Sequence, residues 1–226
     1  MQYEIWGDMM PAITITMEAG ESIYTQSGGM SWMTDKIEMT TNTKGGFMKG
    51  LGRMFSGDSL FMATYTSQAP AQQLTIASAV PGNIKQFEIN PSYSIVAQKG
   101  AFLCATQGVE IKPFVTNVKG GFFGGEGFIL QQYVGQGTVF CELDGSIREM
   151  ELAAGEKLVI DTGNVAAWES TVTYNSQMVK GFKNVLFGGE GLFLTTLTGP
   201  GKVWLQTMSV AELAKALIPY IPTSSN

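Results

Sequence analysis

The chain contains no histidine, and this absence excludes several function classes at once. Ser-His-Asp and Cys-His catalysis, histidine metal sites and the commonest general base at neutral pH all need an imidazole. Cysteine is nearly as scarce, because Cys104 and Cys141 are the only two, and neither belongs to a CxxC pair. The sequence therefore predicts no disulfide framework, no metal site and no other cofactor. We expect a protein that is not an enzyme.

Charge is sparse as well. Only 15% of the residues are charged and the net charge is −5, with 14 Lys and Arg, so we do not expect nucleic-acid binding. No apolar run approaches the roughly 18 residues of a membrane-spanning helix, and no basic and apolar leader opens the sequence, which favours the cytoplasm. A surface so poor in charge predicts that part of it is hidden in an oligomer.

Glycine, aromatic and aliphatic residues are abundant instead. The chain has 28 glycines, 11% aromatic residues and 44% hydrophobic residues. This composition is typical of many short strands joined by tight turns around a substantial core. The sequence predicts an all-β fold with one domain over residues 1–226.

A glycine-rich phrase occurs three times. The copies read "FSGDSLFMATYT" (55–66), "FGGEGFILQQYV" (123–134) and "FGGEGLFLTTLT" (187–198). Each follows a leader of turn, apolar run, turn and second run, such as "GESIYTQSGG", "PSYSIVAQKG" and "GEKLVIDTGN". The copies are 68 and then 64 residues apart, and such a nearly regular period indicates tandem units that bury their apolar faces against one another. We predict a β-sandwich or barrel of three β-repeats in a pseudo-threefold arrangement, with approximate ranges 12–80, 84–143 and 147–208.

A short helix is expected over residues 209–218. Ser209 and Glu212 have the spacing of a capping box, and Pro219 ends the pattern. Leu213, Leu217 and Ile218 fall on one face, so we expect this helix to dock on the sheets.

The segment "KGGFMKGLGRMF" (44–55) is basic and amphipathic. One interpretation is that it lies on an anionic membrane surface or in the groove of a protein partner. The other is a connector whose Met and Phe side chains cover the end of the barrel and whose charges are solvated. Four glycines weaken any helix there by about 1 kcal/mol each. The residues predicted to make the interaction are Lys44, Phe47, Met48, Lys49, Leu51, Arg53 and Met54.

Each glycine phrase also carries an acid at an equivalent place: Asp58, Glu126 and Glu190. Around a pseudo-threefold axis they could converge on a cation or polar ligand. We favour the alternative that each accepts backbone N–H bonds in its own turn. "GGEG" has neither the spacing of a dinucleotide fingerprint nor the Lys-Ser/Thr of a phosphate loop.

The four tryptophans and one pair of acids complete the candidates. Trp6, Trp32, Trp168 and Trp204 could stack on a sugar or base, but Trp32 and Trp168 occupy nearly matching repeat positions, which favours core packing. Glu149 and Glu151 are interpreted as a solvated strand edge.

Taken together, "KGGFMKGLGRMFSGDSLFMATYT" and the two later phrases "FGGEGFILQQYVGQGTVF" and "FGGEGLFLTTLTGPGKVWLQT" resemble a known family. It is the bacterial, archaeal and mitochondrial group named for altered inheritance of mitochondria, number twenty-four, formerly a domain of unknown function. The resemblance covers essentially the whole chain. It implies a β-sandwich of tandem repeats, related in fold to the trp RNA-binding attenuation protein, and a homotrimer. No catalytic residues are carried over, and the mitochondrial members are linked to inner-membrane organisation.

The leading functional hypothesis is therefore a non-enzymatic scaffold or interaction protein. It would associate with itself as a homotrimer and meet a membrane surface or partner through residues 44–55, as a cytoplasmic protein peripheral to a membrane. The alternative is a small-ligand binder that uses polar groups around the pseudo-threefold axis. RNA binding rests on fold analogy and fits the acidic composition poorly.

Overall fold

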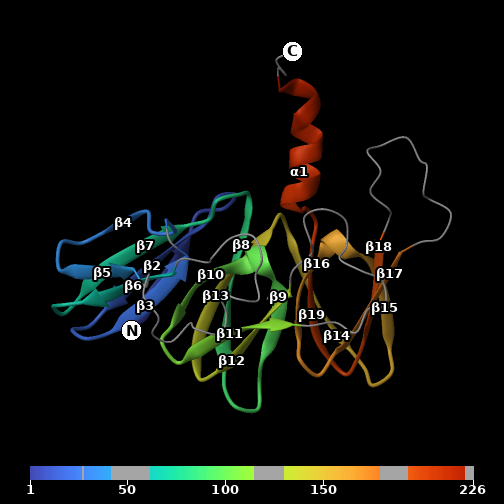
Figure 1. Cartoon of the computed structure of the whole chain (residues 1–226), viewed down its shortest axis with the longest axis horizontal. Coiled ribbons are helices and arrows are strands. Elements are labelled where there is room, and N and C mark those ends of the chain that lie inside the picture. Colours follow the sequence, from blue (N-terminus) through green and yellow to red (C-terminus); the bar gives the residue numbers. More distant parts are fainter. Residues whose placement is uncertain (27, 42–61, 115–129, 179–192, 222–226) are drawn as a thin grey trace.

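The computed structural model describes residues 1–26, 28–41, 62–114, 130–178 and 193–221, and nearly all regular structure in them is β-strand (Figure 1). These ranges hold nineteen strands and one short α-helix. The all-β prediction is confirmed.

Apart from β1 (Gln2–Trp6), the strands fall into three groups of six, which we call units 1, 2 and 3. Unit 1 holds β2 (Ala12–Met17), β3 (Ser22–Gln26), β4 (Trp32–Met33), β5 (Ile37–Thr41), β6 (Met62–Ser67) and β7 (Gln72–Ala77). Unit 2 holds β8 (Gly82–Ile89), β9 (Ile95–Gln98), β10 (Phe102–Thr106), β11 (Val109–Phe114), β12 (Leu130–Gly135) and β13 (Gly137–Asp144). Unit 3 holds β14 (Ile147–Leu152), β15 (Lys157–Asp161), β16 (Val165–Glu169), β17 (Thr173–Met178), β18 (Phe193–Thr198) and β19 (Gly201–Gln206).

In the ranges that the structure describes, three 3-10 turns and one helix accompany the strands. They are η1 (Lys99–Ala101), η2 (Thr162–Asn164), α1 (Val210–Leu217) and η3 (Ile218–Tyr220). In Figure 1 the units lie in a row, from unit 1 in blue on the left to unit 3 in orange on the right.

Local sequence explains these elements. In β2, Ile13, Ile15 and Met17 are buried while the threonines between them are partly exposed, which is the period-two pattern of a strand. Glycine is needed where two turns approach closely: a Cβ on Gly108 would lie 2.1 Å from the carbonyl oxygen of Gln136.

The same pairing pattern recurs in every unit. The first, sixth and third strands form one sheet, and the second, fifth and fourth form another. Sheets then continue across units, because β10 of unit 2 pairs with β3 of unit 1, and β16 of unit 3 pairs with β9 of unit 2. The result is two full six-stranded sheets, β5-β6-β3-β10-β13-β8 and β11-β12-β9-β16-β19-β14.

A half-sheet remains at each end of the row. The N-terminal half-sheet has the order β1-β2-β7-β4, and the C-terminal half-sheet has the order β15-β18-β17. Among the strand pairs of the described residues, none joins unit 1 to unit 3. The three repeats therefore form an open row within one chain, and the pseudo-threefold arrangement is not closed by hydrogen bonds there.

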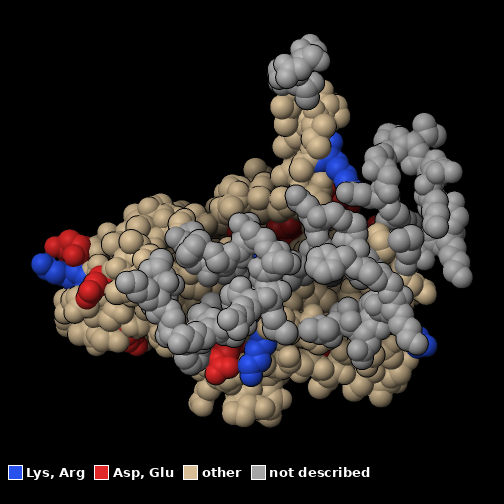
Figure 2. All heavy atoms as spheres, viewed as in Figure 1, with Lys and Arg blue, Asp and Glu red and all other residues tan. Residues whose placement is uncertain are grey.

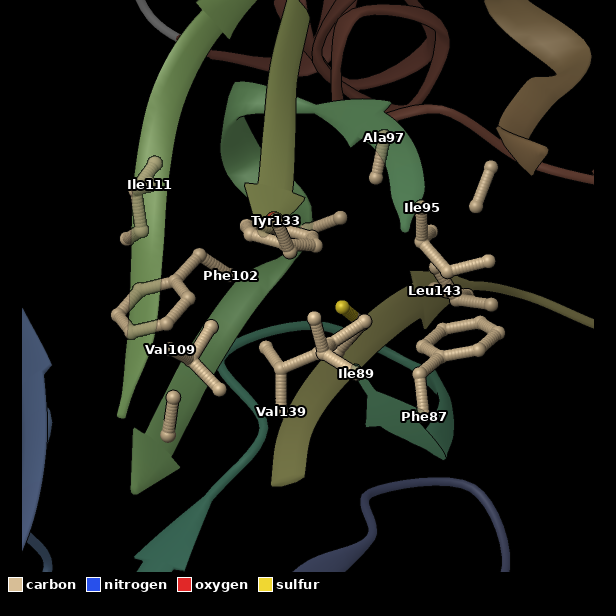
Figure 3. Packing of buried hydrophobic residues seen from close by; sticks show 14 of the residues in the cluster. Phe87, Ile89, Ile95, Ala97, Phe102, Val109, Ile111, Tyr133, Val139 and Leu143 are labelled. Carbon is tan, nitrogen blue, oxygen red and sulfur yellow. The ribbon is translucent and has the colours of Figure 1, made fainter. Parts of the chain in front are cut away.

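Among the described residues, three hydrophobic clusters lie between consecutive sheets. The middle cluster, between the two full sheets, contains Phe102, Tyr133, Val139 and Leu143 (Figure 3). Neighbouring residues of one strand serve opposite clusters: Phe140 packs toward the N-terminal half-sheet, while Val139 packs toward the second full sheet. Each full sheet is thus covered on both faces.

The C-terminal helix forms as predicted but does not dock. The Ser209 hydroxyl accepts a hydrogen bond from the Glu212 amide at 3.2 Å, which caps the helix. Its apolar residues Val210 and Leu217 are nevertheless exposed, and Figure 1 shows α1 projecting from the sheets. The docking expectation was wrong because, in the described residues, each full sheet is already covered on both faces by its neighbouring sheets.

Candidate self-association interface

The edges of the two half-sheets are the candidate site. Inside the chain, the third strand of each unit pairs with the second strand of the unit before it. In the ranges that the structure describes, the third strand of unit 1 (β4) and the second strand of unit 3 (β15) have no such partner from another unit. In the described residues β4 has β7 as its partner, and β15 has β18.

The residues of β4 can be matched to their internal counterparts by register. The third and fourth residues of the sixth strand face Met33 and Trp32 in unit 1, and Ala105 and Cys104 in unit 2. In unit 3 they face Trp168 and Ala167. Trp32 therefore corresponds to Cys104 and Ala167, which are fully buried, yet Trp32 is 54% exposed.

The expectation that Trp32 packs in a core like Trp168 was wrong. The two positions differ by one residue in register, so their side chains point to opposite faces of the sheet. Trp168 is fully buried and stacks on Tyr174 with ring centroids 5.0 Å apart.

The residues of β15 can be matched in the same way. Val159 follows Leu158, which pairs with Leu197. Val96 follows Ile95, which pairs with the equivalent Tyr133. Val96 is fully buried, because β16 of the next unit lies beside β9, whereas Val159 is 61% exposed. Both open edges thus expose an apolar side chain whose internal counterpart is buried.

Polar contacts also join neighbouring units. The Glu149 carboxylate of unit 3 accepts a hydrogen bond from Lys85 Nζ of unit 2 at 3.1 Å. Within unit 3 it also accepts hydrogen bonds from Trp204 Nε1 at 2.8 Å and Lys202 Nζ at 3.0 Å. The hydrogen bonds from Lys202, Trp204 and Lys85, in that order, lower the pKa of Glu149 to about 2. The interpretation of Glu149 as a merely solvated acid was wrong.

Charged side chains are few on the face that Figure 2 shows. Among the described residues, no group of three or more Cys, Asp and Glu side chains is placed to hold a metal ion. In the same ranges, no helix has the length and hydropathy needed to cross a bilayer.

The residues predicted from sequence to form a site lie outside the described residues. This holds for the basic segment and for the three repeat-equivalent acids. They are Lys44, Phe47, Met48, Lys49, Leu51, Arg53, Met54, Asp58, Glu126 and Glu190.

Comparison with known proteins decides the family. The sequence profile of the family described as mitochondrial biogenesis AIM24 matches residues 3–208. The chain belongs to this AIM24 family. An uncharacterised protein of Streptococcus pyogenes serotype M6 is 31% identical over 227 residues, which cover 96% of this chain and 89% of that protein.

A solved structure supports the fold of this AIM24 family member. The crystal structure of a protein from Streptococcus pyogenes matches with a TM-score of 0.77 and 28% identity, over 97% of this chain and 99% of that one. The family resemblance drawn from the glycine phrases is therefore confirmed.

Sequence reasoning missed Met33 and Val159 at the open edges, and it favoured core packing for Trp32, which is exposed there. A signal for Val159 was present, because the leaders "SIVAQ" and "KLVID" align Val96 with Val159. What a single sequence lacked was the pairing between units, which shows that one of these valines is covered and the other is not.

Proposed function

We propose that this protein is a non-enzymatic scaffold that assembles head to tail, β15 of one copy pairing with β4 of the next, into a closed homotrimer. The observation that carries the proposal is the pair of complementary half-sheets. Joined edge to edge they would have the order β17-β18-β15-β4-β7-β2-β1, in which the first six strands repeat the strand order of both full sheets.

The internal junctions also predict the register of the new one. Ala105 pairs with Tyr24, and Trp168 pairs with Val96. The equivalent pair between copies is Met33 with Val159, followed by Trp32 with Ile160. This register supports the proposal because it covers Val159 and Trp32 together with the free N–H and C=O groups of both edges.

Such an interface joins two different surfaces of each copy, so it produces either a closed ring or an open filament. The family resemblance favours closure with three copies, which would place nine units in the ring. The scaffold could also meet a membrane surface or protein partner through residues 44–55, and for this contact the support is the sequence pattern alone. Three copies of a weakly binding segment would act together by avidity.

The test is a disulfide between copies. Met33→Cys with Val159→Cys should give, on mild oxidation, a covalent trimer of three times the 24.3 kDa chain mass, while each single variant stays uncrosslinked. A matched control is Met39→Cys with Val159→Cys, since Met39 is exposed on β5 of the same unit but away from β4.

Size-exclusion chromatography with light scattering measures the untreated protein in parallel. A trimeric mass is expected from the wild-type chain. A monomer at micromolar concentration, or crosslinking that is as efficient in the Met39 control, would overturn the proposal.

A further inference from the structure

Each internal junction places an aromatic side chain under a cover from an earlier part of the chain, either the preceding unit or β1. Trp204, the fourth residue of β19, meets Phe87 of unit 2 edge-to-face with ring centroids 4.8 Å apart. Lys85 lies over the same indole, with Nζ 5.9 Å from its centroid. Phe140, the fourth residue of β13, is covered by Tyr3 of β1 at 4.9 Å.

Unit 1 has an indole at the corresponding place, but this indole comes from Trp6 of β1 and not from the sixth strand. The fourth residue of β7 is Thr75, and its hydroxyl lies 3.0 Å from that of Thr14 across the strand pair. Trp6 Nε1 donates to Thr14 Oγ1 at 3.0 Å, as Trp204 Nε1 donates to Glu149, the counterpart of Thr14. The Trp6 ring lies 6.1 Å from that of Trp32.

This pair of indoles has no preceding unit to cover it within the chain. Trp6 is 41% exposed and Trp32 is 54% exposed. In the head-to-tail assembly the preceding unit is unit 3 of another copy. The residues of β14 that match the cover can be read from the register.

Lys85 pairs with the fifth residue of β13, and Arg148 pairs with the fifth residue of β19. Phe87 and Met150 likewise pair with the third residues of the same two strands. Arg148 is therefore the counterpart of Lys85, and Met150 that of Phe87.

Arg148 and Met150 also lie on the face of the sheet that a contact with the next copy requires. Glu149 points toward the first full sheet, where it meets Lys85, so Arg148 and Met150 point to the opposite face. Met150 packs at the cluster between the second full sheet and the C-terminal half-sheet. In the proposed assembly, the N-terminal half-sheet of the next copy would continue the C-terminal half-sheet on this side of the second full sheet.

We propose that Arg148 of one copy stacks over the Trp6–Trp32 pair of the next copy and that this cation–π contact selects the head-to-tail partner. The inference rests on the proposed assembly. Arg148 is exposed and has no ion-pair or hydrogen-bond partner in the ranges that the structure describes. A guanidinium suits the contact because it is planar, weakly hydrated and stacks well on indole.

The experiment compares Arg148→Ala, Arg148→Lys and the control Lys112→Ala, which removes an exposed cation from β11 at the opposite edge of the same sheet. The dissociation constant of the assembly is measured by concentration-dependent light scattering. We expect Arg148→Ala to weaken each junction about tenfold, Arg148→Lys to weaken it less, and Lys112→Ala to leave it unchanged.

Acrylamide quenching gives a second readout, because Trp168 and Trp204 are buried and the accessible indoles are Trp6 and Trp32. Quenching should fall on assembly and rise again in assembled Arg148→Ala. In a Trp6→Phe, Trp32→Leu background, Arg148→Ala should have little further effect on assembly.

The outcomes separate the two proposals. A wild-type trimer with unchanged dissociation and quenching in Arg148→Ala would overturn the Arg148 contact and leave the ring standing. The absence of any trimer, with no crosslink between positions 33 and 159, would overturn the ring.

Discussion

Replacing Glu149 by Gln is the sharpest test of the packing between units 2 and 3. The carboxylate joins three donors from two units: Trp204 Nε1 at 2.8 Å, Lys202 Nζ at 3.0 Å and Lys85 Nζ at 3.1 Å. Glutamine keeps the shape and one acceptor oxygen but removes the charge. The loss is therefore that of two ion pairs and of the charge assistance to the indole bond.

The magnitude is limited by exposure. The Glu149 side chain is 39% exposed, so water screens both ion pairs and each contributes about 0.5 kcal/mol. With the weakened indole bond, the free energy of unfolding at pH 7 should fall by about 1–2 kcal/mol. For a chain of this size that corresponds to a drop in Tm of roughly 3–6 °C.

The lowered pKa of Glu149 also predicts how its contribution to stability changes with pH. The folded-state pKa of Glu149 is lowered from 4.5 to about 2, chiefly by the bond from Lys202, so its stabilisation is present in full above pH 4.5. It declines as the pH falls toward 2 and is absent below that. The difference between wild type and variant should thus be constant from pH 5 to 8 and shrink between pH 4.5 and 2.

Urea unfolding at fixed protein concentration measures the difference, with Glu151→Gln as the matched control. Glu151 is exposed two positions along the same strand and should cost less than about 0.5 kcal/mol. Equal losses in the two variants, or a Glu149 effect that persists unchanged at pH 2.5, would refute the reasoning.

Two further predictions concern buried groups. The side-chain amide of Gln131 in β12 is fully buried without a hydrogen-bond partner in the described residues, so Gln131→Leu should raise the free energy of unfolding by about 1–3 kcal/mol in urea titrations. Gln132→Leu, which loses a bond to Ser94 Oγ, should lower it, and the reverse order would contradict this account. Burial raises the pKa of the Cys141 thiol to about 12 and that of Cys104 further still. Both thiols should therefore fail to react with a thiol reagent at pH 8 in the native protein but react with it in urea. Rapid labelling of the native protein would show that the thiols are not buried.

Local signals accounted for the elements of this fold. Alternating apolar residues and glycine turns predicted strands, and the Ser209–Glu212 capping box predicted α1, because each depends on residues close together in sequence. The repeated glycine phrases indicated three β-repeats before any pairing was known.

Contacts between distant residues were not predictable in the same way. Lys85 meets Glu149 only because β8 and β14 come together at the junction of two units. The exposure of Trp32 depends on a register shift of one residue, which the sequence pattern does not resolve. The predicted interaction residues and acids lie outside the described ranges, so those hypotheses stay predictions.

The sharing of sheets between units has a consequence for how the protein unfolds. Neither full sheet belongs to one unit, because the β3–β10 and β9–β16 pairs lie at their centres. Unfolding of unit 2 would remove three of the six strands of each full sheet and would expose an apolar face on both unit 1 and unit 3. Denaturation should then pass through the whole row in one cooperative step, and unit 2 cut out of the chain should not survive as a miniature protein.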